Sequence, residues 1–261
     1  MQKDNWLAKA VLITGGSGGV GKATAERFLS EGANLMLADI NESRLQEVTE
    51  ELSSYNGRVC SSIIDITQVS DCEAAIAETV KAFGRLDILI NAAGVWVEGD
   101  SAMSTEKEWD WVIDVNLKGT YFMCARAIPE LKKTKGCIIN LSSDAGLMGL
   151  KGAAIYCASK GGVVLLTKAL AVELAPDLVR VNAVCPADIM TPMLKYQANT
   201  YGEGNPEAYY KNLLSNYPQG EKARFIEAKE VAEFVFFLAS ARAQAITGAA
   251  LPIDFGTTAG E

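Results

Sequence analysis

Residues 14–21 read Thr-Gly-Gly-Ser-Gly-Gly-Val-Gly, and this glycine-rich stretch decides the expected fold. It follows a continuous apolar run over residues 10–14, which is typical of a buried parallel strand. From residue 21 to residue 31 apolar side chains recur at helical spacing, and Gly32 ends the expected helix. Glycines at such a turn let the chain bend sharply and let a pyrophosphate approach the N–H groups that start the helix. The context therefore predicts a dinucleotide-binding turn.

The glycines of this turn satisfy two overlapping motifs. Gly16, Gly18 and Gly21 match GxGxxG, whereas Gly15, Gly19 and Gly21 match GxxxGxG. A glycine-rich loop often only makes a turn, so the strand before it and the helix after it carry the interpretation. The residues of the turn that we expect to meet the dinucleotide are Gly15, Ser17, Gly18, Gly19, Val20 and Gly21.

Short apolar strands and amphipathic helices alternate along the rest of the chain. Further strands are expected over residues 34–39, 59–64, 86–90, 137–141, 179–184 and 250–254. Helices are expected over residues 42–52, 71–83, 109–131 and 155–175, the first of them capped by Asn41. This alternation predicts an α/β fold, with a doubly wound, Rossmann-like parallel sheet of about seven strands in three α/β/α layers.

The chain reads as one domain over residues 1–261, because no linker, repeat or low-complexity tract interrupts it. Residues 188–224 show no clear periodicity, so we expect an irregular substrate lid there. Its tyrosines would either wall an apolar or ring-shaped substrate or pack the lid on itself. They are Tyr196, Tyr201, Tyr209, Tyr210 and Tyr217.

Composition excludes several classes of site. The sequence has no histidine, which excludes Ser-His-Asp and Cys-His catalysis and histidine-ligated metals. Its six cysteines form no CxxC pair, so we expect free thiols in a reducing compartment and no metal. A net charge of −8 without a basic cluster argues against a nucleic-acid partner. Residues 1–6 hold no signal-like apolar core, and no apolar run approaches about 18 residues, so we expect a soluble cytoplasmic protein without a membrane partner.

Asp39 ends the second expected strand, about 20 residues past the glycine turn. An acid at this place binds the ribose hydroxyls of a dinucleotide and repels a 2′-phosphate. Ser17 and Gly18 in the turn, and Ile40 and Asn41 after Asp39, offer no basic side chain to compensate. These features favour NAD over NADP. The alternative is that Asp39 only caps the next helix.

Further motifs follow in order along the chain. The motif Asn91-Ala92-Ala93-Gly94 comes after the fourth expected strand, and Ser143 comes after the fifth. Tyr156 and Lys160 lie four apart on an expected helix, thirteen residues and more beyond that serine. With Asn116 and the glycine turn, this set resembles the short-chain dehydrogenase/reductase family over essentially the whole chain. The resemblance implies an NAD-dependent oxidoreductase that interconverts a secondary alcohol and its ketone.

The chemistry of the set agrees with that resemblance. A phenol has a pKa near ~10, and both a neighbouring Lys160 ammonium and a nicotinamide cation would lower it, so Tyr156 could act as general acid/base. Ser143 would hold the substrate oxygen at the end of its strand. The resemblance further implies that Lys160 binds the nicotinamide ribose and that Asn116 supports Lys160 through water. Singly, Tyr156 could be a core aromatic, Ser143 a turn serine and Asn116 a helix-kink residue.

The resemblance also implies further contacts. Those to the dinucleotide are Asp65 and Ile66 beside the adenine, Asn91 on the ribose side, Gly94 in the same motif, and Ile189 and Thr191 at the carboxamide, while Trp96 is expected at the substrate mouth. Two positions depart from the family pattern, since Ala187 and Phe255 stand where glycine is usual. Because alanine enters positive φ less readily, we expect a differently shaped nicotinamide loop at Ala187. Phe255 is expected to pack against a subunit or the substrate.

The expected helix over residues 155–175 is apolar nearly all round, more than a helix that covers a sheet needs. The excess indicates a partner subunit, and the resemblance points to a homotetramer. Two alternative functions stay open. One is an acyl-carrier-protein ketoreductase, which would prefer NADP and a basic docking surface, and the other is a non-catalytic dinucleotide-sensing protein.

Overall fold

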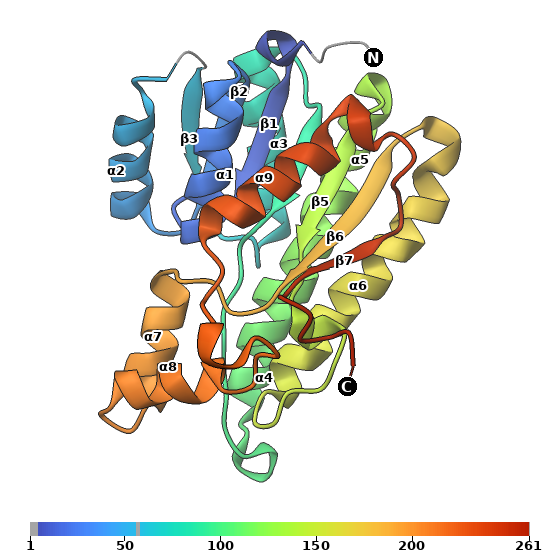
Figure 1. The fold of residues 1–261 in the computed structure, drawn as a ribbon. Coiled ribbons are helices and arrows are strands. Elements are labelled where there is room, and N and C mark those ends of the chain that lie inside the picture. The colour runs from blue at the N-terminus through green and yellow to red at the C-terminus, as the bar shows by residue number, and fades with distance from the viewer. Residues whose placement is uncertain (1–4, 56–57, 261) are drawn as a thin grey trace.

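A parallel sheet of seven strands runs through the computed structural model, which describes residues 5–55 and 58–260 (Figure 1). The strands are β1 (Ala10–Thr14), β2 (Asn34–Asp39), β3 (Val59–Ile63), β4 (Ile88–Asn91), β5 (Cys137–Leu141), β6 (Arg180–Pro186) and β7 (Ala250–Ile253). Their order is β3-β2-β1-β4-β5-β6-β7, and each neighbouring pair is parallel. The order reverses between β1 and β4, and such sheets bind ligands at the carboxyl ends of strands beside this point. The predicted α/β fold class is confirmed, while the expectation drawn from residues 1–4 lies outside the described residues.

Helices cover both faces of the sheet (Figure 1). They are α1 (Gly19–Ser30), α2 (Glu42–Leu52), α3 (Val69–Phe83), α4 (Glu106–Ile113), α5 (Thr120–Thr134), α6 (Ala154–Leu174), α7 (Pro192–Tyr201), α8 (Pro206–Leu214) and α9 (Ala228–Ala239). On one face α1 and α9 bring Phe28 and Phe236 together in an apolar core. On the other face α3, α5 and α6 bury Ile76, Met123 and Leu170 in a second core. The three-layer arrangement leaves the carboxyl ends of the strands for a site.

Local signals explain most helix limits, and two predicted segments differ from the structure. Asn41 caps α2 as predicted, because its side chain accepts a hydrogen bond from the Arg44 N–H at 3.1 Å. The helix predicted over residues 109–131 is divided, since a π-helical turn, Asp114–Gly119, joins α4 to α5. The predicted irregular lid contains α7 and α8, each of which begins at a proline. Helix α9 lies outside the predicted helices.

The apolar character of α6 has a structural explanation. By length and composition alone, the segment Ala154–Asp177 could cross a membrane. Half of its most apolar stretch is nevertheless buried inside the fold. A helix that packs on a sheet passes the same test of length and hydropathy, so this segment is weak evidence for a membrane span.

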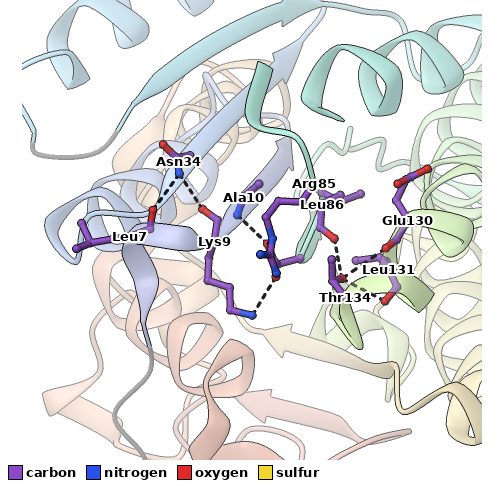
Figure 2. A network of polar contacts seen from close by, with 10 residues as sticks. Leu7, Lys9, Ala10, Asn34, Arg85, Leu86, Glu130, Leu131 and Thr134 are labelled. Carbon is purple, nitrogen blue, oxygen red and sulfur yellow. Dashed lines mark hydrogen bonds and ion pairs between the residues drawn. The ribbon is translucent and has the colours of Figure 1, made fainter. Parts of the chain in front are cut away.

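A buried carboxylate closes the opposite, amino-terminal edge of the sheet. Asp87 precedes β4 and is 1% exposed. Its Oδ1 accepts hydrogen bonds from Lys9 Nζ at 2.9 Å and Arg85 Nη2 at 2.7 Å. Its Oδ2 accepts from the Ala10 N–H at 3.0 Å and Arg85 Nε at 2.7 Å. Figure 2 shows Lys9, Ala10 and Arg85 converging here, so the buried charge is fully hydrogen-bonded and ties β1 to β4.

Candidate active site

The glycine turn is packed too closely for side chains at four positions, Gly15, Gly16, Gly19 and Gly21. Gly15 has a φ of +65°, and a Cβ there would lie 2.7 Å from the backbone nitrogen of Ala93. A Cβ on Gly21 would overlap the carbonyl oxygen of Gly15. All three glycines of GxxxGxG leave less than 3.0 Å for a Cβ, whereas Gly18 of GxGxxG leaves 3.2 Å, so the geometry favours the GxxxGxG register.

Helix α1 begins at Gly19 with an open N-terminus. No side chain of the described residues caps it, and its first turn carries no acid. The first N–H groups of a helix have no partner within the helix, and together with the helix dipole they bind anions. This open end and the close-packed glycines fit a pyrophosphate.

The Asp39 carboxylate bonds to the glycine turn. Its Oδ2 accepts hydrogen bonds from the Ser17 N–H at 3.0 Å and from the Ser17 hydroxyl at 2.7 Å. Its Oδ1 accepts from the Asn41 N–H at 3.0 Å. Because Asn41 itself caps α2, the alternative role of Asp39 as that cap is not needed. The carboxylate lies at the end of β2, where ribose hydroxyls are expected.

Three more of the expected residues lie just after β3 and at the end of β4. Asp65 Oδ1 accepts hydrogen bonds from the Thr67 N–H at 2.9 Å and hydroxyl at 2.7 Å, and Ile66 is 8% exposed beside it. Asn91 is 2% exposed, and its Nδ2 donates to Asn140 Oδ1 at 2.8 Å. Its own Oδ1 is buried with no hydrogen-bond partner among the described residues. The side chain of Asn91 therefore ties β4 to β5 beneath the site rather than at its surface.

The expected catalytic side chains meet at the carboxyl end of β5. Ser143 follows that strand, and Tyr156 and Lys160 lie one turn apart on α6. The Lys160 Nζ lies 5.7 Å from the centre of the Tyr156 ring and donates to the Leu141 carbonyl oxygen at 2.9 Å. Ser143 donates its hydroxyl to Asp144 Oδ1 at 2.7 Å. Ser143 and Tyr156 line the same cavity.

Burial dominates the protonation of this set. It raises the pKa of Tyr156, and the hydroxyl of Ser143 opposes that rise. Negative charge on Asp144 and Asp188 raises the Tyr156 pKa further. Burial also lowers the pKa of Lys160 to about 8. The sequence-based expectation of a lowered Tyr156 pKa is thus wrong for the protein alone, because burial and the charges of Asp144 and Asp188 raise this pKa.

Asn116 lies in the π-helical turn and is fully buried. Its Oδ1 accepts a hydrogen bond from the Val95 N–H at 2.8 Å, and its Nδ2 donates to the Val95 carbonyl at 3.0 Å and to Ser159 Oγ at 3.1 Å. A Cβ on Gly94 would lie 3.3 Å from Asn116 Oδ1 and 3.4 Å from Lys160 Nζ. Asn116 therefore binds the segment after β4 to α6 beside Lys160, and the water-mediated contact stays a prediction.

These side chains surround a cavity of about 130 Å³ at the carboxyl edge of the sheet. The expected site residues that line it are Val20, Trp96, Ser143, Tyr156, Lys160, Ile189 and Thr191. The ring of Trp96 lies 4.3 Å from that of Tyr156. Sequence reasoning missed two lining carboxylates, Asp144 and Asp188. Their place in the sequence could have revealed them, because Asp144 directly follows Ser143 and Asp188 comes two residues after Pro186.

The lid reaches the cavity through α7 rather than through its tyrosines. Met193, Leu194 and Gln197 line the cavity, whereas the lid tyrosines are absent from its described lining. Tyr196 packs edge-on against Tyr201 at 6.3 Å. The other aromatic pairs of the lid are Tyr210 with Phe225 and Tyr217 with Phe255. Of the two readings of these tyrosines, packing of the lid is the one observed.

A carboxylate joins the lid to the segment after β4. Glu98 Oε2 accepts a hydrogen bond from the Tyr209 hydroxyl of α8 at 2.7 Å. The same oxygen accepts from Trp96 Nε1 at 2.8 Å. Because Trp96 lies against Tyr156, this clamp links the lid to the Tyr156 ring.

The two departures from the family pattern have different outcomes. Ala187 lies outside the left-handed region and donates its N–H to the Ile253 carbonyl at 3.0 Å, so alanine fits here without strain, and the expected difference in loop shape stays a prediction. Phe255 has a φ of +54°, which is an uncommon conformation for a bulky residue. Its ring lies 6.3 Å from that of Tyr217 and 4.7 Å from the guanidinium of Arg224. Phe255 therefore packs against the lid of its own chain.

Comparisons with known proteins cover nearly the whole chain. A family model described as enoyl-(acyl carrier protein) reductase matches residues 15–258. The chain is 37% identical over 249 residues to 3-oxoacyl-[acyl-carrier-protein] reductase FabG of Thermotoga maritima, covering 95% of this chain and 97% of that protein. It is 38% identical over 261 residues to meso-2,3-butanediol dehydrogenase of Serratia marcescens, covering 100% and 98%. The crystal structure of levodione reductase superposes with a TM-score of 0.92 at 31% identity, covering 97% and 99%.

Proposed function

Because this chain belongs to the short-chain dehydrogenase/reductase family, whose members here are oxidoreductases of alcohol and ketone groups, we propose that it interconverts a secondary alcohol and its ketone with NAD rather than NADP. The observation that carries the proposal is one cavity lined by Ser143, Tyr156 and Lys160, next to the open N-terminus of α1. Together they offer an anion site, a proton donor and acceptor, and a hydroxyl for the substrate oxygen.

A bound nicotinamide dinucleotide would supply or accept the hydride. The glycine turn would hold its pyrophosphate, with Asp39 on the adenosine ribose. Asp65 and Ile66 would border the adenine, the backbone at Asn91 and Gly94 the ribose side, and Ile189 and Thr191 the carboxamide.

Each catalytic side chain has one task. Ser143 orients the substrate oxygen toward Tyr156, which lines the same cavity. Tyr156 takes the alcohol proton during oxidation and returns it during reduction. Lys160, held by the Leu141 carbonyl, binds the ribose and offsets negative charge on the phenolate. Asn116 keeps the surrounding backbone in place for Lys160.

A screen of secondary alcohols, followed by the absorbance of the reduced dinucleotide, tests the activity. We expect Tyr156→Phe to lose about 100-fold or more of kcat on any alcohol that the wild type oxidises, because it keeps the ring and loses the proton. Tyr121→Phe, an exposed tyrosine of α5, is the matched control. A Tyr156→Phe variant with more than about a tenth of the wild-type rate would remove Tyr156 from its assigned role.

The same assay tests the choice of dinucleotide. The carboxylate of Asp39 would repel a 2′-phosphate by on the order of 1–4 kcal/mol, which favours NAD. We expect kcat/KM to be higher with NAD, and Asp39→Ala to narrow the difference. Equal or better kcat/KM of the wild type with NADP would contradict this preference.

A second candidate is reduction of a 3-oxoacyl group on acyl carrier protein, which the name of the Thermotoga relative favours. Such an enzyme would need a basic surface for its acidic carrier, and the net charge of −8 weighs against it. Reduction of acetoacetyl-acyl carrier protein faster than of any free ketone would establish it.

We also infer a cytoplasmic homotetramer that acts on a small molecule and needs no nucleic acid or membrane. Leu165 and Val172 on α6 are 68% and 79% exposed, which supports contact with another subunit. The free thiols among the described residues agree with a reducing compartment. Cell fractionation and light scattering test the two assignments.

A further inference from the structure

The substrate end of the cavity carries more negative charge than alcohol oxidation itself requires. Asp144 follows β5 and Asp188 follows β6, and both line the cavity beside Tyr156. Among the described residues of this lining, Lys160 is the one cation. Its Nζ is already bound to the Leu141 carbonyl, so the cavity is acidic where a substrate would enter.

Each carboxylate has one oxygen bound by the protein and one oxygen open. Asp144 Oδ1 accepts hydrogen bonds from Ser143 Oγ at 2.7 Å and from the Ala145 N–H at 2.7 Å. Asp188 Oδ2 accepts from the Tyr217 hydroxyl at 3.1 Å. Within residues 5–55 and 58–260, no hydrogen bond reaches the second oxygen of either carboxylate. An acceptor without a partner in a mostly buried place favours a ligand that brings a donor.

Packing holds Asp188 in this position. Tyr217 is 5% exposed and also accepts the Asp188 N–H at 2.9 Å. Its ring packs on Phe255, which lies under the guanidinium of Arg224. That guanidinium is bound by both oxygens of Glu230, each at 2.7 Å, so its charge is already matched. The carboxylate of Asp188 is therefore a fixed acceptor.

We propose that Asp144 and Asp188 select alcohols whose neighbouring group is a neutral hydrogen-bond donor, a second hydroxyl above all, and reject alcohols that carry a carboxylate there. The inference rests on the proposed alcohol oxidation at Tyr156. A hydroxyl donates to an open carboxylate oxygen, and a hydrogen bond to a charged acceptor is the stronger kind. A substrate carboxylate has no donor and meets two like charges where the dielectric is low. A methyl group neither donates a hydrogen bond nor carries a charge, so kcat/KM for an alcohol with a methyl group there should lie between the other two.

Three small alcohols share the unit CH3–CH(OH)– and differ only in the third group. They are 1,2-propanediol, 2-butanol and lactate, each supplied as the racemate with NAD at pH 8. We expect kcat/KM for the diol to exceed that for 2-butanol about 10-fold and that for lactate about 100-fold or more.

Asp144→Asn and Asp188→Asn each keep an acceptor oxygen and remove a charge. Each is expected to lower the ratio of kcat/KM for the diol to that for lactate about 10-fold. Removing the charge relieves the repulsion of the lactate carboxylate more than it weakens the hydrogen bond from the diol. Glu221→Gln is the control, since Glu221 is an exposed acid of the lid segment outside the cavity, and its ratio should match the wild type.

The outcomes separate this inference from the function on which it rests. Equal kcat/KM for diol and lactate in the wild type overturns the inference and leaves alcohol oxidation standing. A ratio that neither aspartate variant changes does the same, because the selectivity then comes from other groups. No NADH from any of the three alcohols, from an enzyme that oxidises other secondary alcohols of the screen, overturns this inference alone. No NADH from any alcohol of the screen overturns the proposed function and this inference with it.

Discussion

At Asp188, burial raises the pKa of the carboxyl to about 6, and the charge of Asp144 adds to the rise. The hydrogen bond from Tyr217 opposes it. In the unfolded chain the same group titrates near ~4. Because the folded state disfavours the charged form, the penalty is absent below about pH 4 and grows as the pH rises through about 6.

We therefore expect Asp188→Asn to raise the free energy of unfolding at pH 8 by on the order of 1–3 kcal/mol and to change it little at pH 4. Asparagine still accepts the Tyr217 hydroxyl bond but carries no charge to desolvate. Urea unfolding followed by circular dichroism at the two pH values measures the difference. An effect of equal size at both would contradict the assigned cause.

The acids of the cavity also mark where sequence reasoning ends. Ser143, Tyr156 and Lys160 could be predicted, because Tyr156 and Lys160 share one helix face and the family resemblance selects the serine thirteen residues before Tyr156. The pair Asp144 and Asp188 could not, since their burial depends on the packing of the lid. The direction of the Tyr156 pKa failed for the same reason, because desolvation is a property of the packed site.

Among the elements, β1 and β4 depend on the carboxylate at their amino ends. Asp87→Ala would leave the buried Ala10 N–H without its acceptor, while the partly exposed Lys9 and Arg85 could turn to water, so we expect a loss of about 1–3 kcal/mol in the free energy of unfolding. The catalytic site lies at the other edge of the sheet, so kcat of the folded variant should stay near that of the wild type.

Glu47→Gln is the control for that prediction. Glu47 forms an exposed ion pair with Arg44, and pairs of this kind contribute about 0–1 kcal/mol. Urea unfolding of the two variants beside the wild type gives the comparison. If Asp87→Ala lost no more free energy of unfolding than Glu47→Gln, the hydrogen bonds to Asp87 would contribute little to stability.

Elements with an apolar period could be predicted, and those set by tertiary contacts could not. The predicted strands 10–14, 34–39 and 137–141 match the structure residue for residue, because a buried parallel strand is a continuous apolar run in the sequence. The π-helical turn escaped prediction because Asn116 binds Val95 and Ser159, which lie far away in sequence. Helices α7 and α8 escaped because short helices rich in polar and aromatic residues show little periodicity.

At the scale of the whole molecule, the outer face of α6 predicts assembly. Helix α4 contacts α6 and exposes Trp109 and Trp111, which extends the apolar surface that Leu165 and Val172 begin. We expect light scattering to give a tetramer at micromolar concentration and a smaller species for the double variant Leu165→Lys, Val172→Lys.

Leu7→Lys serves as the control, because Leu7 is 70% exposed in a different part of the molecule. That variant should assemble like the wild type. A wild-type protein that scatters as a monomer, or a double variant of unchanged mass, would refute the assignment of α6 as a subunit contact.

The clamp formed by Trp96, Glu98 and Tyr209 places an intrinsic fluorescent probe, the indole of Trp96, beside the cavity. An indole in van der Waals contact with Tyr156, its N–H held by a carboxylate, emits light whose wavelength and yield follow the polarity around it. A ligand that displaces water from around Trp96 should shift the emission wavelength. A change in the mobility of the lid should change the fluorescence anisotropy of Trp96. Since the remaining tryptophans, Trp6, Trp109 and Trp111, lie elsewhere in the fold, the difference spectrum against Trp96→Phe isolates this one fluorophore. Binding of a ligand to the cavity could then be titrated by Trp96 fluorescence, without any turnover.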